Sequence, residues 1–250
     1  MQLSKIKNTL IGDKKFYLRV VSIVLPMIIQ MTVTNVVNLL DNVMVGRVGT
    51  LQMSAVAIVN QLIFVFNLCI FGGLAGAGIF STQYAGAKDN EGVRFCFRAK
   101  TVIGATMLIL AAIIFFVFPK PLISMYLAEG TSASDASATL GYGLSYLKIM
   151  VIGLIPFTVT QIYSSTLREI GETKLPMIAS LVAIFINLVF NYLLIFGKFG
   201  FPKLGVAGAA IATVMSRFAE AVIIVVISTL KSDKYPFIKG ALRSLYVPLS

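Results

Sequence analysis

The sequence predicts an all-α polytopic membrane protein, a bundle of six transmembrane helices. Its residues are 58% hydrophobic and only 12% charged, with a mean hydropathy of +0.91, far from the balance of a soluble domain. Six apolar stretches each exceed the roughly 20 residues that a helix needs to cross the hydrocarbon core. The spans expected are Phe16–Val45, Leu51–Tyr84, Phe95–Phe118, Thr139–Leu167, Leu175–Phe196 and Leu204–Leu230. The alternating ten-residue pattern of a membrane β-barrel is absent.

Turn signals separate these stretches in chain order. The first span carries Pro26 and the fourth carries Pro156, and each proline is expected to kink its helix. Gly86–Gly92 forms a compact turn between the second and third spans, and Lys120–Ala138 forms a polar loop before the fourth. Gly171–Pro176 then turns the fourth span into the fifth, with its proline near the start of the new helix, where proline is tolerated.

The formal net charge of +11 follows the expected topology. If the N-terminus is cytoplasmic, fifteen Lys and Arg residues lie in inside segments and four in outside segments. This bias predicts cytoplasmic termini in a bacterial-type plasma (inner) membrane. The excess of basic residues is then a signal of topology, aided by anionic lipid of the inner leaflet, and no nucleic acid is expected as a partner. The basic start and first apolar run resemble a signal peptide, but the run is too long and lacks a cleavage site, so it is expected to remain as a span.

The side-chain inventory argues against an enzyme. The chain has no His, so neither metal-dependent hydrolysis nor nucleophilic catalysis through a Ser/His or Cys/His pair has its usual base. Cys69 lies in the middle of the second span and Cys96 near the cytoplasmic end of the third, which makes a disulfide or a shared metal site improbable.

Asp41 is the main candidate for a functional residue, because an Asp at membrane depth costs about 2.5–3.5 kcal/mol on insertion scales. Gln30, Thr34, Asn38 and Asp41 are spaced by four, four and three residues, so they form one polar stripe on the first helix. Such a stripe faces a bundle interior or a wet cavity. A site for a cation or a substrate is the favoured reading, and a structural carboxyl satisfied by neighbouring helices is the alternative.

Other spans add polar side chains that can meet this stripe. Asn187 and Asn191 are four residues apart on the fifth span, and Thr213 lies on the sixth. With Asp41 they supply oxygens for Na⁺, or a hydrogen-bond network around a protonatable carboxyl. Apart from Na⁺ at Asp41, the sequence predicts no metal site, and apart from Na⁺ or H⁺ it predicts no cofactor. Span two adds Asn60, Gln61 and Asn67, and span four adds Tyr146, Gln161 and Tyr163. We assign to a substrate cavity Gln30, Thr34, Asn38, Gln61, Tyr146 and Gln161.

Arg217 and Glu220 are three residues apart on the sixth span. This spacing favours an intrahelical ion pair that neutralises two buried charges.

Several segments in the same order resemble the multidrug and toxic compound extrusion (MATE) transporters. They are Leu25-Pro26, Leu40–Gly49, Gln83–Asp89, Leu167–Met177, Asn187–Gly197 and Gly205–Thr213. The resemblance implies a cation-coupled antiporter that exports organic, often cationic compounds in exchange for Na⁺ or H⁺. It also implies two homologous six-helix lobes with the substrate cavity between them.

The family's ion site maps onto Asp41, Asn187, Asn191 and Thr213. Some members carry Asp at the position of Asn191, so this chain lacks one negative charge of that version, and the coupling ion stays open. By the same resemblance, residues 1–230 are one lobe of a twelve-helix fold, and residues 231–250 are a cytoplasmic inter-lobe linker with the start of a seventh span. The expected partner is a C-terminal lobe or a second copy.

Two other functions remain as alternatives. A lipid-linked oligosaccharide flippase of the same superfamily would hold pyrophosphate with several arginines, whereas only Arg217 lies deep in a span. A membrane scaffold that does not transport would make the polar stripe dispensable.

Overall fold

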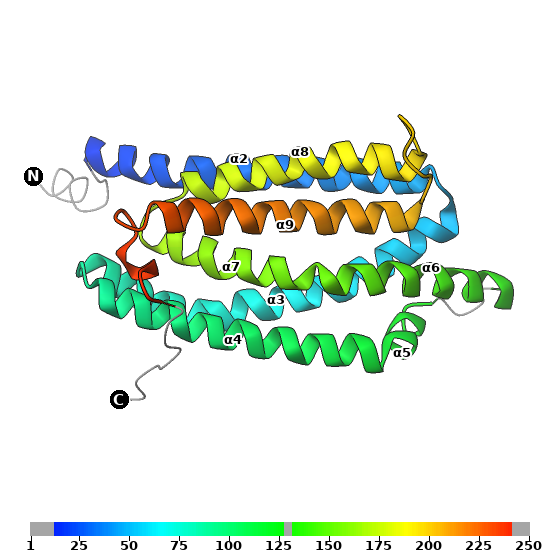
Figure 1. The fold of residues 1–250 in the computed structure, drawn as a ribbon, viewed down its shortest axis with the longest axis horizontal. Helices are drawn as coiled ribbons and strands as arrows, with labels where there is room; N and C mark the ends of the chain where they lie inside the picture. Colours follow the sequence, from blue (N-terminus) through cyan, green and yellow to red (C-terminus); the bar gives the residue numbers. More distant parts are fainter. Residues whose placement is uncertain (1–12, 128–131, 242–250) are drawn as a thin grey trace, which may run out of the picture.

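The computed structural model describes residues 13–127 and 132–241, and every element in these residues is a helix. This confirms the all-α class. The α-helices are α2 (Lys14–Gly46), α3 (Thr50–Gly86), α4 (Asn90–Val117), α5 (Pro119–Ser124), α6 (Ala133–Ile152), α7 (Leu154–Glu169), α8 (Lys174–Phe196) and α9 (Val206–Leu230), followed by a short 3₁₀ helix, η1 (Pro236–Ile238). The long helices run side by side along one axis, with α2, α8 and α9 on one side of the bundle and α3 and α4 on the other (Figure 1).

Five helices, α2, α3, α4, α8 and α9, are each long and apolar enough to cross a membrane. The expected fourth span is divided into α6 and α7, which meet at Gly153 with a bend of 44° and count as one further span if taken together. The bend therefore lies three residues before Pro156 rather than at it. Pro156 occupies the first turn of α7, where its missing N–H costs no hydrogen bond. α2, in contrast, runs through Pro26 as one helix of 33 residues.

Side-chain caps fix where several helices begin. Asp13 accepts a hydrogen bond from the backbone N–H of Phe16 at 2.7 Å, and Asp89 accepts from those of Glu91 and Gly92 at 3.0 and 3.1 Å. These carboxylates satisfy N–H groups that have no partner within the first turn of a helix.

Small residues allow the helices to approach closely. A Cβ at Gly208 of α9 would lie 2.6 Å from the carbonyl oxygen of Leu194 on α8, so this pair needs glycine. A Cβ at Gly73 of α3 would lie 2.4 Å from the Met107 side chain on α4. Gly73 and Gly208 are thus points of close helix packing, and α8 and α9 form a close pair against which α2 lies.

α2 is the least buried of the long helices. Its buried residues are Pro26, Val37 and Val45, and its remaining apolar side chains are largely exposed. It packs mainly against α8, which leaves its Asp41 face directed at a space bounded by α3, α8 and α9.

Basic residues gather where α2, α4 and α8 begin, which we call the basic end; it includes Lys14, Lys88, Arg94, Lys174 and Lys231. Residues 231–241 fold against it: Arg94 Nη2 donates to the Pro236 carbonyl at 3.2 Å, and the Phe237 ring packs 5.7 Å from that of Phe97. The rest of the expected linker, residues 242–250, lies outside the described residues.

Candidate ion and substrate site

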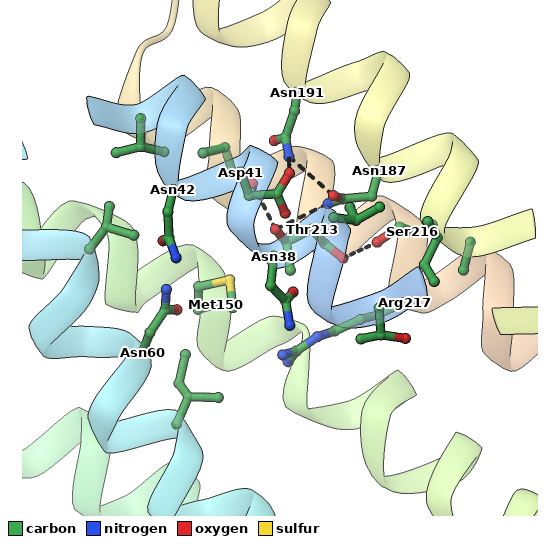
Figure 2. A pocket seen from close by; sticks show the side chains of 18 of the residues that line it. Asn38, Asp41, Asn42, Asn60, Met150, Asn187, Asn191, Thr213, Ser216 and Arg217 are labelled. Atoms are coloured by element: carbon green, nitrogen blue, oxygen red, sulfur yellow. Dashed lines mark hydrogen bonds between the residues drawn. The ribbon is translucent and has the colours of Figure 1, made fainter. Parts of the chain in front are cut away.

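Asp41 lies at the centre of a network that joins α2, α8 and α9 (Figure 2). Asn191 Nδ2 donates to Asp41 Oδ1 at 2.7 Å and to Asn187 Oδ1 at 3.1 Å. Asn187 Nδ2 donates to Thr213 Oγ1 at 3.3 Å, and the Thr213 hydroxyl donates to the Ala209 carbonyl at 3.0 Å. The four residues of the predicted ion site are therefore in one connected cluster, held by three helices.

The Asn187 amide can face Asp41 in two ways. In one orientation its oxygen lies 2.9 Å from Asp41 Oδ2, a distance that requires a proton on the carboxyl group, since both atoms are otherwise acceptors. With the amide rotated, its Nδ2 occupies that position and donates to the ionised carboxylate. The rotated amide satisfies an ionised Asp41 but turns its nitrogen toward Asn191 Nδ2 at 3.1 Å, so it replaces the Asn191–Asn187 hydrogen bond.

Asp41 is held by neutral groups. Within residues 13–127 and 132–241, no Lys or Arg forms an ion pair with it. Asn191 Oδ1 is buried and has no hydrogen-bond partner there, so one further acceptor at the cluster is unused. An uncompensated carboxylate with a spare amide oxygen is an arrangement that can take up a proton or a small cation.

The cluster forms one wall of a cavity of about 450 Å³. Thr34, Asn38 and Asn42 line it from α2, and Figure 2 shows Asn42 and Asn60 pointing toward one another from α2 and α3. Tyr146 reaches in from α6 and donates to Asn60 Oδ1 at 3.3 Å. The volume is within the range of small-molecule sites, and the polar lining comes from five helices.

Three predicted cavity residues, Gln30, Gln61 and Gln161, do not line this space. Gln30 lies one turn before Thr34 on the same stripe, beyond the end of the cavity, and accepts from Arg168 Nη2 at 3.2 Å. Gln61 is exposed, because it follows the cavity-facing Asn60 by one residue and so points about 100° away around α3. Gln161 is half-buried on α7, which the bend at Gly153 directs away from the cavity.

The profile of the MatE family matches residues 26–193, which is more than half of the chain. The chain belongs to the MatE family. The match begins at Pro26 and takes in Asp41, Asn187 and Asn191.

Curated relatives agree with this membership. The chain is 28% identical over 249 residues to the probable multidrug resistance protein NorM of Thermotoga maritima, covering 96% of this chain and 50% of that protein. It is 31% identical over 209 residues to the NorM protein of Bacillus cereus, covering 83% of this chain and 44% of the relative. The chain thus spans about half the length of these relatives.

Solved structures show the same fold. The crystal structure of a MATE P26A mutant matches with a TM-score of 0.73 at 21% identity, over 90% of this chain and 51% of that one. An outward-facing multidrug resistance MATE family transporter of the MOP superfamily matches with a TM-score of 0.70 at 22% identity, again over 51% of its chain. The MatE chain described here is therefore a multi-pass membrane protein with the fold of one half of these transporters.

Asn60, Asn67 and Asn42 line the cavity of this MatE chain but were not assigned to it from the sequence. Asn60 and Asn67 are seven residues apart, two helical turns, so they share a face of α3 with Val56 and Ile63, which also line the cavity. That spacing was the signal that could have selected them over Gln61. Asn42 follows Thr34 and Asn38 at intervals of four on α2, so the helical spacing that selected those two could also have selected Asn42.

Arg217 does not pair with Glu220 as the spacing suggested; no ion pair joins them in the part of the chain that the structure describes. Arg217 Nη1 instead donates to the Gly153 carbonyl at 3.3 Å, and its guanidinium lies 5.2 Å from the centre of the Phe157 ring. The break between α6 and α7 exposes this carbonyl and ring to α9, which gives the guanidinium closer partners than Glu220.

Lys100 is one of the fifteen basic residues that the charge count assigns to inside segments, and its side chain is fully buried. Its Nζ lies 2.6 and 2.5 Å from the two carboxylate oxygens of Glu169 on α7, and 3.2 Å from Thr166 Oγ1. Lys100 thus joins α4 to α7 through a buried ion pair that sequence reasoning missed.

Proposed function

We propose that this chain forms the ion-binding half of a cation-coupled antiporter that exports organic, often cationic compounds in exchange for Na⁺ or H⁺. The observation that carries the proposal is the Asp41 network at the wall of the cavity. An ion site that shares its walls with a substrate site lets occupancy of one affect the other, which is what exchange requires.

The chemistry of the network supports both coupling ions. A proton on Asp41 would be donated to the Asn187 amide oxygen, and its loss would be answered by rotation of the same amide. Na⁺ would draw on oxygens of Asp41, Asn187 and Thr213. Dependence of transport on the gradient of one ion and not the other distinguishes these cases.

The cavity argues for transport over the two alternatives. Of the described residues that line it, Arg217 is the single arginine, and its guanidinium is engaged by Gly153 and Phe157. A pyrophosphate group would therefore find few cationic partners. A scaffold has no need for an unpaired carboxylate at membrane depth, which is costly unless it has a use.

The second wall of the cavity would come from a companion lobe. The exposed apolar face of α2 and the exposed Asn38 and Asn42 border the cavity, and the curated relatives are about twice as long as this chain. Polar groups of this kind are tolerated at membrane depth only against protein or water. A C-terminal lobe or a second copy of the chain would provide that cover.

For orientation, we propose that the basic end faces the cytoplasm of a bacterial-type cell and that the protein lies in the inner membrane. Single cysteines at Ser232 and Ser134, in a background without Cys69 and Cys96, test this with a membrane-impermeant thiol reagent. In intact cells Ser134→Cys should label and Ser232→Cys should not. The reverse pattern would contradict the orientation.

The functional test measures accumulation of a fluorescent organic cation in an efflux-deficient host. The chain is expressed alone and together with a C-terminal lobe of a relative, under imposed Na⁺ or H⁺ gradients. We expect gradient-dependent extrusion with both lobes present, and its loss in Asp41→Asn at unchanged membrane expression. Asp135→Asn, the same change at an exposed carboxylate at the start of α6, is the matched control and should extrude normally. Full extrusion by Asp41→Asn would reduce Asp41 to a structural residue.

A further inference from the structure

A second cavity, of about 540 Å³, lies at the basic end between α2, α3 and the last turn of α7. It is separate from the Asp41 cavity, with which it shares no lining residue. The contact between Gln30 on α2 and Arg168 on α7 lies between the two spaces. None of the residues at this cavity has a role in the site described above.

The cavity walls carry a positive excess. Arg19 of α2 and Arg168 of α7 both line it. Glu169 lines it as well, but both of its carboxylate oxygens are held by Lys100 Nζ, so that this pair contributes no net charge. The two guanidinium groups are therefore the charged groups of the lining left to a ligand, and Glu220, which is not in the lining, is the acidic group that acts on Arg168.

Arg168 has donors to spare. It donates from Nη2 to Gln30 at 3.2 Å, while its buried Nε has no hydrogen-bond partner among the residues that the structure describes. The carbonyls that end α7 do not use it, because Thr166 O, Leu167 O and Arg168 O accept from the backbone of the following turn. The Nε is buried, so a ligand in the cavity would pair with the terminal N–H groups of this guanidinium, of which one is used by Gln30.

The α2 wall is amphipathic along its length. Arg19, Ile23 and Met27 follow one another at intervals of four, so they form a single line with the charge nearest the start of the helix and the apolar side chains deeper in the bundle. A ligand matched to this line has an anionic head at Arg19 and Arg168 and an apolar tail along Ile23 and Met27. A free inorganic anion would use only the first part.

We propose that this cavity binds the phosphate headgroup of an anionic phospholipid from the leaflet at the basic end. The phosphate lies between Arg19 and Arg168, and the start of an acyl chain follows Ile23 and Met27. The basic residues of the same end attract anionic lipid to the mouth of the cavity, and basic pockets between transmembrane helices are known to bind such headgroups. Bound there, the lipid links α2 to α7 at the end of the bundle opposite the α2–α3 turn.

The test uses the purified full chain in detergent micelles and native mass spectrometry, with phosphatidylglycerol, phosphatidylcholine or inorganic phosphate added. The wild-type chain should retain one tightly held phosphatidylglycerol and bind phosphatidylcholine more weakly. Arg19→Gln with Arg168→Gln should weaken phosphatidylglycerol binding by about 30-fold, the change that two such charges give near an anionic headgroup. Lys174→Gln with Lys231→Gln removes two exposed charges from the same end and should change it by less than about threefold.

Two single variants guard against a misfolded double variant. Arg19→Gln alone alters an exposed side chain, and Met27→Trp fills the cavity while both arginines remain; each should weaken binding. Binding of inorganic phosphate as tight as that of phosphatidylglycerol would assign the site to a soluble phosphate and overturn the lipid proposal. Equal losses in the arginine and lysine double variants, or unchanged binding in Met27→Trp, would overturn the proposal.

Discussion

Asp41 and Glu169 are two carboxylates inside the same helix bundle with opposite surroundings. Glu169 is held by a fully buried ammonium group, Lys100, assisted by the hydroxyls of Thr166 and Ser165. Asp41 is held by the neutral amide of Asn191, with Asn187 and Thr213 behind it. The charge of Glu169 is neutralised by Lys100 within the protein. The charge of Asp41 has no counter-charge among its hydrogen-bond partners.

The different partners of Glu169 and Asp41 predict different consequences when each carboxylate is neutralised. A buried ion pair is strongly weakened when one partner is removed, because the remaining charge is left uncompensated. A carboxylate among amides already lacks a counter-charge, so neutralising it relieves a cost and removes only a function. The same reasoning favours α4–α7 as a source of stability and agrees with the proposal that coupling involves α2, α8 and α9.

The first prediction concerns the paired site. Glu169→Gln leaves the ammonium of Lys100 buried and should lower the free energy of unfolding by about 3–5 kcal/mol. Asp41→Asn should change it by less than about 1 kcal/mol, because the amide keeps most of the hydrogen bonds. Titration with sodium dodecyl sulfate in mixed micelles, followed by circular dichroism, measures both.

Lys100→Met combined with Glu169→Gln is the control for this contrast, since it removes both charges and should recover most of the loss. If Asp41→Asn proved as destabilising as Glu169→Gln, the distinction between a structural and a coupling carboxylate would fail.

The second prediction ranks the amides at the unpaired site. Asn191→Ala removes the 2.7 Å donor to Asp41 and should weaken ion coupling by about 10- to 100-fold, the value of a hydrogen bond to a charged group. Asn187→Ala should have a smaller effect, because Asn191 still reaches Asp41. The measurement is the ion concentration that gives half-maximal extrusion of a fluorescent cation by the two-lobed transporter.

Asn67→Ala serves as the matched amide control, since Asn67 lines the same cavity from α3 but does not bond to the Asp41 network. An effect of Asn67→Ala as large as that of Asn191→Ala would mean that the cavity as a whole, and not the contact with Asp41, sets the ion affinity.

The two sites also differ in how far the sequence revealed them. Helical spacing put Thr34, Asn38 and Asp41 on one face, and residue type and position singled out Asn187, Asn191 and Thr213. The family resemblance then mapped Asp41 and these three onto one ion site, and the structure brings them together. Periodicity defines the face of a helix but not how far a cavity extends along it. The spacing therefore assigned Gln30 to the cavity, although Gln30 lies beyond its end. Nothing in the spacing of Lys100 and Glu169, which are 69 residues apart, indicated that α4 and α7 bring them into contact.

The bend in the fourth span shows the same limit. The sequence located a perturbation near Pro156, but the helix breaks at Gly153, where the preceding helix ends and a new first turn accepts the proline. That shift of three residues determines which carbonyl meets Arg217. The expected ion pair between Arg217 and Glu220 does not form, because Arg217 contacts Gly153 and Phe157 of the fourth span instead. Spacing along one helix does not reveal partners on another helix.

The third and smallest prediction extends the comparison to an exposed ion pair. Glu172, in the turn between α7 and α8, accepts hydrogen bonds from Lys234 Nζ and from Tyr235 Oη, the latter at 3.0 Å. Burial opposes ionisation of Glu172, but these donors outweigh it and hold the pKa of its carboxyl below the ordinary value. Since Lys234 is largely exposed, Lys234→Ala should lower the free energy of unfolding by only about 0.2–1 kcal/mol at neutral pH.

The pH dependence gives this small effect a sign that can be checked. A carboxyl whose pKa is lower in the folded state stabilises the fold fully above its ordinary pKa, and that stabilisation is lost as the pH falls through the folded-state value. The difference between wild type and Lys234→Ala should therefore be constant near neutrality and shrink in acid, whereas Lys231→Ala, at an exposed lysine of the same end, should show no such change. A difference that stayed constant on acidification would mean that Lys234 acts through its contact with the Tyr235 ring rather than through the charge of Glu172. In that case, of the Lys234–Glu172 and Lys100–Glu169 pairs, only the buried Lys100–Glu169 pair would stabilise this end of the bundle through its charges.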